Sequence, residues 1–322
     1  MSEKIAVVLF NMGGPDSLQA VRPFLRNLFA DRAIINMPNP FRYLLAEMIS
    51  RGREKEAQKN YAHMGGKSPI VDESEKQASA VEAYLGEHFP KAKIKCFVAM
   101  RYWAPRIDFV QDQIKNWGAD KTVLMPLYPQ FSTTTTGTFF TAWDKHKKLN
   151  NCIKIISYED NNDFISAHVS KIISTYEAKG SPKNLRLIMS AHGLPEKIIE
   201  AGDPYQQQIE KTCAAIAKAL PRPLQDMQIA YQSRVGPLQW IGPATLDEIK
   251  RAASDKKAVM IVPVAFVSEH VETLVELDID YRQQAETMGV KTYIRVPTLG
   301  VEPDYVRALG ELVIEKLKES AR

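Results

Sequence analysis

The sequence predicts an α/β protein built from two Rossmann-like domains, each with a four-stranded parallel sheet flanked by helices. Three observations predict this. Eight short runs rich in apolar and β-branched residues alternate with longer amphipathic segments along all 322 residues. The runs are nearly continuous in apolar residues, which is typical of strands covered on both faces. Repeated strand-then-helix order favours parallel strands with right-handed crossovers.

The expected elements follow from this alternation. We expect strands at residues 5–10, 93–100, 122–127, 153–156, 185–190, 227–232, 258–264 and 292–296. We expect helices at residues 73–89, 105–117, 164–178, 205–220, 245–253, 271–288 and 304–318. Eight strands divide into four and four, so the predicted domains are residues 1–150 and 151–322. The last helix, residues 304–318, has the option of packing back on the first domain.

Composition narrows the class of protein. With 42 basic and 38 acidic residues the net charge is only +4, so no nucleic-acid partner is expected. The cysteines Cys96, Cys152 and Cys213 lie far apart, which excludes a zinc ribbon and argues against a disulfide framework. The apolar run at 5–10 is too short for a signal peptide, and the stretch at 258–267 is about half a bilayer span. A cytoplasmic location is therefore expected.

Two glycine-rich turns resemble phosphate loops without completing one. The stretch NMGGPDS (11–17) lacks the G-x-G-x-x-G spacing, and GGKSP (65–69) has Tyr61 where a P-loop needs its first glycine. Pro69 would also break the helix that follows such a loop. Tight turns are therefore the favoured interpretation, and nucleotide binding is not.

Histidines differ in their setting. His192 comes just after the strand at 185–190, within SAHGLP, at the end of a parallel strand where ligands bind. Position alone leaves a structural and a catalytic role equally open. The histidines with polar or charged neighbours are predicted to lie at the surface: His63, His88, His146 and His168.

The most informative stretch is SEHVETLVELDIDY (268–281), directly after a buried strand. In an α-helix Glu269, Glu272 and Glu276 would share one face, with His270 beside them. A solvated acidic face at a helix N-terminus is one interpretation. A site for a divalent cation such as Fe²⁺, or a proton path, is the other, and the placement after a buried strand favours it. Trp240, between two Gly-Pro turns, either plugs a core or faces a flat aromatic ligand.

Seven motifs together resemble those of the ferrochelatases. They are NMGGP, GGKSPI, FVAMRYW, LYPQFSTTTTG, SAHGLP, YQSRVGPLQW and VPVAFVSEHVETLVELDIDY, and they occur in family order along nearly the whole chain. The resemblance implies the chelatase fold, with a porphyrin cleft between two Rossmann-like domains. It also implies insertion of ferrous iron into protoporphyrin IX to give protoheme, with release of two pyrrole protons.

The resemblance also implies roles for particular residues. His192 and Glu272 correspond to the opposed catalytic pair and are candidate metal ligands; which of them takes the protons stays open. His270 and Glu276 correspond to further cleft positions, Glu276 on a helix that the family winds partly as a π-helix. The positions that line or close over the macrocycle correspond to Met12, Arg53, Ser68, Arg101, Tyr102 and Trp240. The apolar segment at 24–49, which by itself predicts an amphipathic helical hairpin, corresponds to the lip of the cleft.

The chain departs from some members of that family. Those members bind a [2Fe–2S] cluster through four cysteines, whereas this chain has Thr133 at the loop position and ends at Arg322 without a cysteine-bearing tail. We expect no cluster and no other prosthetic group, with porphyrin and ferrous iron as substrates. We expect a monomer or a weak dimer, and the apolar lip leaves peripheral contact with the inner face of the membrane open.

Other functions compete with this one. Within the family the alternative is a coproporphyrin-specific enzyme. Outside it, one alternative is a non-catalytic two-domain protein that binds metal or heme, and another is a nucleotide-sugar transferase. The transferase is weakened by the lack of a complete phosphate loop.

Overall fold

The chain divides into two compact units. The computed structural model describes residues 2–146, 148–149, 152–234, 236 and 238–320. Unit 1 comprises Met1–Leu127, Ser132–Ile156 and Leu309–Arg322, and unit 2 comprises Tyr128–Phe131 and Ser157–Ala308. The boundary expected at residues 150 and 151 lies outside the described residues.

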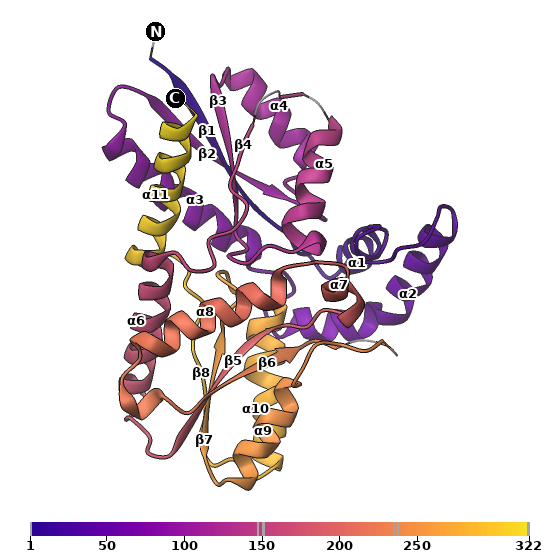
Figure 1. Ribbon diagram of the computed structural model, residues 1–322. Helices are drawn as coiled ribbons and strands as arrows, with labels where there is room; N and C mark the ends of the chain where they lie inside the picture. Colours follow the sequence, from indigo (N-terminus) through magenta and orange to yellow (C-terminus); the bar gives the residue numbers. More distant parts are fainter. Residues whose placement is uncertain (1, 147, 150–151, 235, 237, 321–322) are drawn as a thin grey trace. The chain divides into compact units, whose positions relative to one another are not determined.

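Unit 1 is built on a parallel sheet. Among its described residues the sheet has four strands in the order β2–β1–β3–β4 (Figure 1). Its elements in chain order are β1 (Lys4–Asn11), α1 (Val21–Phe29), α2 (Phe41–Ala62), α3 (Ile70–His88), β2 (Lys93–Met100), α4 (Ile107–Trp117), β3 (Lys121–Pro126), the π-helix η1 (Thr133–Gly137), α5 (Thr138–His146) and β4 (Ile153–Lys154). The central strand β1 is buried from Ile5 onward because helices cover both faces of the sheet.

The helices of unit 1 cover both faces of its sheet. Helix α3 covers one face, and α4 and α5 cover the other (Figure 1). The later half of α11 (Pro303–Glu319), from Leu309 onward, also belongs to unit 1 and lies beside α3. Gly310 permits this contact, since a Cβ there would lie 2.2 Å from Cδ1 of Tyr84. The hydroxyl of Tyr84 donates to Oε1 of Glu311 at 2.7 Å.

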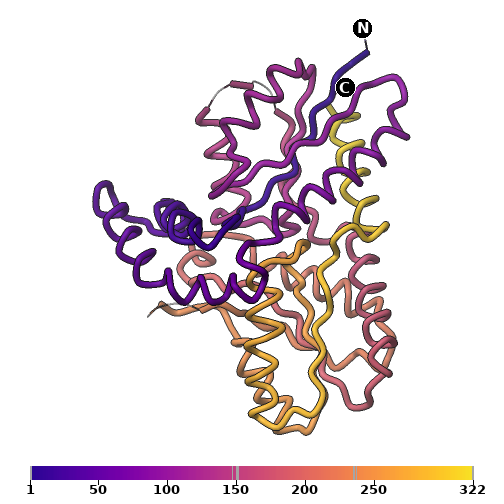
Figure 2. The backbone as a smooth tube through the Cα atoms, turned by 180° about the vertical axis from the view of Figure 1, so that it is seen from behind, coloured from indigo at the N-terminus to yellow at the C-terminus, as the bar shows by residue number. Residues whose placement is uncertain are grey.

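Helices α1 and α2 form a hairpin that we call the arm (residues 21–62). It extends away from the sheet of unit 1 (Figure 2). The carboxylate of Glu47 on α2 is paired with Arg22 on α1, and it also accepts from Nε of Arg51 at 2.9 Å. The hairpin predicted for residues 24–49 is therefore present, with its second helix longer than predicted.

Unit 2 repeats the same architecture. Among its described residues the sheet has four parallel strands in the order β6–β5–β7–β8. Its elements are α6 (Asn162–Ala178), β5 (Leu185–His192), α7 (Glu196–Glu200), α8 (Tyr205–Ala219), the 3₁₀-helix η2 (Arg222–Leu224), β6 (Met227–Gln232), α9 (Thr245–Ser254), β7 (Ala258–Pro263), the π-helix η3 (Glu272–Asp280), α10 (Tyr281–Thr287), β8 (Tyr293–Arg295) and the start of α11. Helices α6 and α8 cover one face, and α9 and α10 cover the other (Figure 1).

The predicted fold class is confirmed, and each predicted strand corresponds to a strand of the described chain. Two local expectations need correction. The sequence predicts no helix at 133–146. This segment forms η1 and α5, and Phe139 of α5 stacks on Phe10 with ring centroids 3.8 Å apart. The helix expected at 271–288 is a π-helix followed by an α-helix.

No helix in the described residues has the length and apolar content needed to span a bilayer.

The surface position predicted for His168 is wrong. This residue lies on α6 with only 2% of its surface exposed, and its ring meets the Phe164 ring edge-on at 4.8 Å between centroids. Its Nε2 has no hydrogen-bond partner among the described residues. Burial lowers the pKa of His168 to about 3. Its polar neighbours in sequence lie on the other side of the helix, so sequence neighbours were a poor guide to burial.

This burial predicts an acid-sensitive stability. An unfolded chain binds a proton at His168 near pH 6.5, whereas the folded chain does so only near pH 3. The contribution of this residue is therefore present above pH 6.5 and is lost as the pH falls. At pH 5 we expect it to cost about 2 kcal/mol of unfolding free energy. His168→Leu should flatten the stability profile between pH 6.5 and 4.5, as measured by urea denaturation.

The matched control is His63→Leu, because His63 is exposed. It should leave the pH profile unchanged. If His168→Leu kept the wild-type slope, the buried imidazole would not be the source of the acid sensitivity.

Candidate active site

The candidate site of unit 2 begins at the carboxyl end of β5. His192 is the last residue of this strand, and the residues from Leu187 to Ala191 before it are buried apolar or small side chains. The strand fixes the backbone of His192, while 38% of its side chain remains exposed. The prediction that this histidine lies at a strand end is confirmed.

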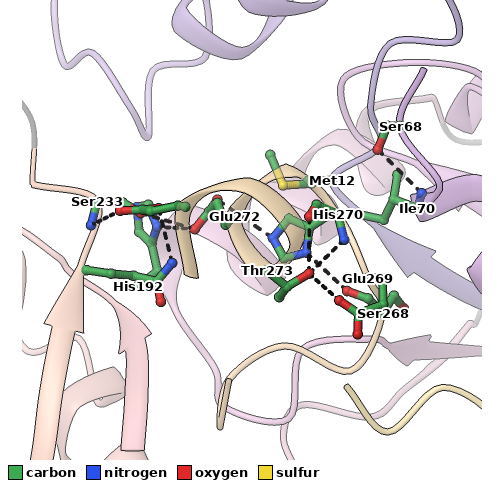
Figure 3. A network of polar contacts seen from close by, with 12 residues as sticks. Met12, Ser68, Ile70, His192, Ser233, Ser268, Glu269, His270, Glu272 and Thr273 are labelled. Atoms are coloured by element: carbon green, nitrogen blue, oxygen red, sulfur yellow. Dashed lines mark hydrogen bonds and ion pairs between the residues drawn. The ribbon is translucent and has the colours of Figure 1, made fainter. Parts of the chain in front are cut away.

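Glu272 meets His192 from the π-helix. Its Oε2 lies 2.8 Å from Nδ1 of His192, and Oγ of Ser233 lies 3.3 Å from the same oxygen (Figure 3). Glu272 is the first residue of η3, whose wider turn pairs each N–H with the carbonyl five residues back. The π-helix expected from the family resemblance is therefore present. Such turns are rare and are concentrated at functional sites.

His192 and Glu272 hold each other in the charged state. Burial would lower the pKa of His192, but the carboxylate of Glu272, with a smaller effect from Glu276, raises it. Burial would raise the pKa of Glu272, but the charge and hydrogen bond of His192 lower it to about 2. The pair thus favours an imidazolium next to a carboxylate.

A second carboxylate continues the network. Oε1 of Glu276 accepts from the backbone N–H of Ser233 at 3.0 Å and from the Tyr281 hydroxyl at 2.9 Å. Its Oε2 accepts from the Ser233 hydroxyl at 2.5 Å and from Nε2 of Gln232 at 3.2 Å. Burial raises the pKa of Glu276, and the negative charge of Glu272 raises it further. Ser233 therefore links a carboxylate that stays ionised to one that takes a proton more readily.

Glu269 does not share the face expected for it. It precedes the π-helix, and its Oε1 accepts from Nη1 of Arg295 at 2.8 Å and from the backbone N–H of Thr298 at 3.0 Å. The expectation of three carboxylates on one face assumed an α-helix that starts before residue 269. The helix begins only at Glu272, so Glu269 is the partner of Arg295, and Glu272 and Glu276 form the acidic pair.

His270 lies beside the pair with 4% exposure. Its Nδ1 lies 3.0 Å from the carbonyl oxygen of Ser268, so this nitrogen donates and carries a proton. Nε2 then faces Oε1 of Glu272 at 3.8 Å (Figure 3). The imidazole is thereby fixed in orientation next to the carboxylate.

Trp240 packs over the residue that follows His192. Trp240 bridges to Pro195, and a Cβ on Gly193 would lie 3.3 Å from Cε3 of the indole. The indole N–H has no hydrogen-bond partner among the described residues. The indole can lie this close to the His192 end of β5 because Gly193 has no side chain.

The remaining predicted site residues belong to unit 1. Backbone N–H groups of Arg101 and Tyr102 donate to the carbonyls of Asn11 and Met12, both at 2.9 Å, which extends the pairing of β1 with β2. Arg101 Nη2 donates to Oδ2 of Asp31 at 2.6 Å. Met12, Arg101 and Tyr102 thus share the carboxyl edge of this sheet.

Ser68 and Arg53 are placed separately from that edge group. Ser68 is 7% exposed just before α3, and its backbone N–H donates to the carbonyl of Pro15 at 2.8 Å. Arg53 on α2 lies over the Phe29 ring, with its Cζ 5.9 Å from the centroid. Arg53 contacts Phe29, whereas Arg101 contacts Asp31 and Thr138, so the common role of these residues stays a prediction.

The donor set in unit 2 suits proton transfer and a hard or borderline cation. One imidazole and two carboxylates lie together: His192 bonds to Glu272, and the Ser233 hydroxyl lies within reach of both Glu272 and Glu276 and donates its one proton to one of them at a time. The described residues contain no group of three or more His, Cys, Asp or Glu side chains with the geometry of a metal cage. Two adjacent ligands leave most of the coordination sphere of a cation to other groups.

Ser233, Gln232 and Tyr281 are site residues that sequence reasoning missed. Ser233 adopts a left-handed backbone conformation, with φ of 62°, directly after β6. Its position directly after a predicted strand was a usable signal, because ligands bind at the carboxyl ends of parallel strands. Serine is common at turns, however, and nothing in its pattern distinguished it from a turn residue.

The fold defines the class of protein. SirB from Bacillus subtilis with Fe³⁺ has a TM-score of 0.57 over 99% of this chain and 97% of that one, at 10% identity. CbiX, the terminal enzyme for siroheme biosynthesis in denitrifying bacteria, has a TM-score of 0.52 at 13% identity over 97% of this chain and 99% of that one. Two parallel four-stranded sheets of this kind make the chelatase fold.

Sequence comparison narrows the class to one family. The family model for Ferrochelatase matches residues 4–317. The Ferrochelatase of Caulobacter vibrioides (strain NA1000 / CB15N) is 54% identical over 97% of this chain and 90% of its own length. That of Rickettsia felis (strain ATCC VR-1525 / URRWXCal2) is 48% identical over 98% of this chain and 91% of its own. The chain belongs to the ferrochelatase family.

The first prediction from this site is that Gly14, after β1, is required for close packing against Ser68. A Cβ on Gly14 would lie 2.5 Å from both Cβ and Oγ of Ser68, so Gly14→Ala should displace Ser68 and cost about 1–3 kcal/mol of unfolding free energy. Urea denaturation measures this cost. Gly52→Ala in α2 is the control, since nothing lies within 4 Å and alanine favours a helix by up to about 1 kcal/mol. Equal effects of the two substitutions would contradict the packing role.

Proposed function

We propose that this protein inserts ferrous iron into protoporphyrin IX to give protoheme and releases the two pyrrole protons. Family membership makes it a chelatase of the lyase class that makes heme from iron and a porphyrin. We further propose that the porphyrin substrate is protoporphyrin and not coproporphyrin. The family assignment disfavours a nucleotide-sugar transferase and a non-catalytic binding protein.

One observation carries the proposal: the ion pair between His192 and Glu272, continued through Ser233 to Glu276. Metallation of a porphyrin requires acceptors for two protons, a ligand that takes the metal from water, and a surface on which the flat ring lies. The chain from His192 to Glu276 supplies the first two of these in a partly buried place.

We assign proton acceptance to His192. Its imidazole has the basicity to take a pyrrole proton near neutral pH once the proton that it holds in the ion pair has left. Glu272 shares that proton by hydrogen bond, and the Ser233 hydroxyl connects Glu272 to Glu276. We propose that protons leave along this chain, with Glu276 as the acceptor because its pKa is raised.

We assign metal contact to His192 and Glu272. A carboxylate and an imidazole are both ligands for Fe²⁺, and Oε1 of Glu272 is not used in the bond to His192. Nε2 of His270 lies 3.8 Å from that oxygen. Iron enters as a substrate, and we propose that no prosthetic group, including a [2Fe–2S] cluster, is needed.

Other predicted residues would hold the porphyrin. Trp240 offers a flat ring close to His192, held by Gly193. Ser68 and the two arginines Arg53 and Arg101 have donors suited to the propionate carboxylates. Met12 and Tyr102 would supply apolar contact at the carboxyl edge of the sheet of unit 1.

An anaerobic insertion assay tests the function. With Fe²⁺ and protoporphyrin IX the wild type should form protoheme, followed by absorbance, and coproporphyrin should be the poorer substrate. His192→Ala should lower kcat by at least about 10²-fold, since a general base contributes 10²–10⁴-fold. Glu272→Gln keeps the shape but removes the charge and should be nearly as severe.

The control is His88→Ala, an exposed histidine on α3. It should turn over at the wild-type rate. Near-normal turnover by His192→Ala would remove its assignment as base. Stoichiometric porphyrin binding by the wild type without product would contradict the function itself.

We also propose that the protein is a cytoplasmic monomer or weak dimer that touches a membrane surface through the arm. Phe41, Leu44 and Met48 are 59–65% exposed and lie at i, i+3 and i+7 on α2, so they share one helix face. Arg51 follows one turn later with its side chain 67% exposed. An exposed apolar stripe with a nearby cation fits the interface of an anionic bilayer.

Vesicle flotation tests this contact. The wild type should float with vesicles that contain phosphatidylglycerol and phosphatidylcholine and less with phosphatidylcholine alone. The double variant Leu44→Ser/Met48→Ser should reduce binding about tenfold or more, because two large apolar groups no longer leave water. Val301→Ser, which changes an exposed residue of unit 2, should bind as the wild type does. Equal binding by all three proteins would exclude the arm as the contact.

A further inference from the structure

Asp31, in the arm just after α1, is a carboxylate with only 7% of its side chain exposed. Three donors from other elements converge on its Oδ2. They are Nη2 of Arg101 at 2.6 Å, the Thr138 hydroxyl at 2.6 Å and the Tyr102 hydroxyl at 3.1 Å. One oxygen of the arm thus holds the end of β2 and the start of α5.

The second oxygen of Asp31 is also used. Oδ1 accepts from the backbone N–H of Ala33 at 2.9 Å, which fixes the carboxylate within its own turn. The arm makes one more bond to the same place, from Nδ2 of Asn27 to the carbonyl of Tyr102 at 3.0 Å. A carboxylate removed from water to this extent persists only because it is paired and hydrogen-bonded.

The network fixes the orientation of Arg101. Its Nη2 is bound to Asp31 and its Nε donates to the Thr138 hydroxyl at 3.2 Å, so two corners of the guanidinium are held. The side chain is still 25% exposed. The planar group therefore presents its remaining Nη1 in a single direction.

The same carboxylate holds Tyr102. The ring is 4% exposed, and Cζ of Arg101 lies 5.0 Å from its centroid. Burial and the nearby charge of Asp31 raise the pKa of Tyr102, so its phenol stays a neutral donor. Arg101, Tyr102 and Asp31 thus form one hydrogen-bonded group.

We infer that Asp31 is a positioning residue for porphyrin binding: it orients Arg101 and Tyr102 and fastens the arm to them. The inference rests on the proposed function, in which Arg101 and Tyr102 contact the porphyrin. Asp31 itself contacts no substrate. Because two side chains and the arm are already ordered, porphyrin binding does not have to order them. Asp31 therefore affects KM more than kcat.

Steady-state kinetics of Asp31→Asn test this role. The amide keeps the shape but turns one accepting oxygen into a donor, so Arg101 loses its counter-ion. We expect the KM for protoporphyrin to rise about tenfold and kcat to fall less than about threefold. Arg101→Met should give a similar rise, and Asp31→Asn/Arg101→Met should be no worse than Arg101→Met, because the two residues act through each other.

Two further variants separate positioning from general destabilisation. Thr138→Val keeps the carboxylate and the charge of Arg101 but removes one hydrogen bond to each, so it should raise KM by a smaller factor. Asp108→Asn, an exposed acid of unit 1 with its side chain 46% exposed, should change neither constant. Circular dichroism and thermal unfolding check that each variant is folded, and Thr138→Val carries the test if Asp31→Asn does not fold.

The outcomes are distinct. A rise in KM with nearly constant kcat and no additivity with Arg101→Met supports the inference. An unchanged KM overturns it. So does a fall in kcat that goes with a lower thermal midpoint and adds to the effect of Arg101→Met. If the wild type makes no heme, the proposed function fails instead, whatever Asp31 does.

Discussion

The ion pair between His192 and Glu272 is the interaction on which the candidate site depends. Burial opposes the charge of each partner, and each charge is favoured by the other, 2.8 Å away. The pair requires a strand that ends at His192 and a helix that begins at Glu272. The π-helix carries both carboxylates: Glu272 is its first residue, and Glu276 contacts Ser233, which also contacts Glu272.

Buried charge is handled similarly in unit 1. Asp31 is satisfied by three side chains, two from the segment after β2 and one from the start of α5, and its removal would leave Arg101 without its counter-ion. Glu269 and Arg295 form a comparable pair behind the π-helix. These groups add little net stability by themselves, but each is costly if broken, so they specify one arrangement of strand ends, turns and helices.

Prediction from the sequence succeeded where a signal was local. The apolar runs identified the strands. Their alternation with helices identified parallel sheets, because a helix that crosses between two neighbouring strands makes those strands run parallel. It missed η1 and α5, where Phe139 packs on Phe10, a residue far away in the sequence. It also failed for His168, since burial on a helix depends on which face meets the core. Most of the assigned site residues came from family motifs, and their roles remain proposals.

By itself, the sequence determined the fold class, the positions of the strands, the family and the location of His192 at a strand end. Those features depend on periodicity and on short motifs, which are written along the chain. Only the tertiary structure decided which carboxylate pairs with which base. It removed Glu269 from the acidic face, joined Glu276 to Ser233 and brought Asp31 to Arg101 across 70 positions of the sequence. Such partners are chosen by distance in space and by the need to satisfy buried charge, and a one-dimensional pattern records neither.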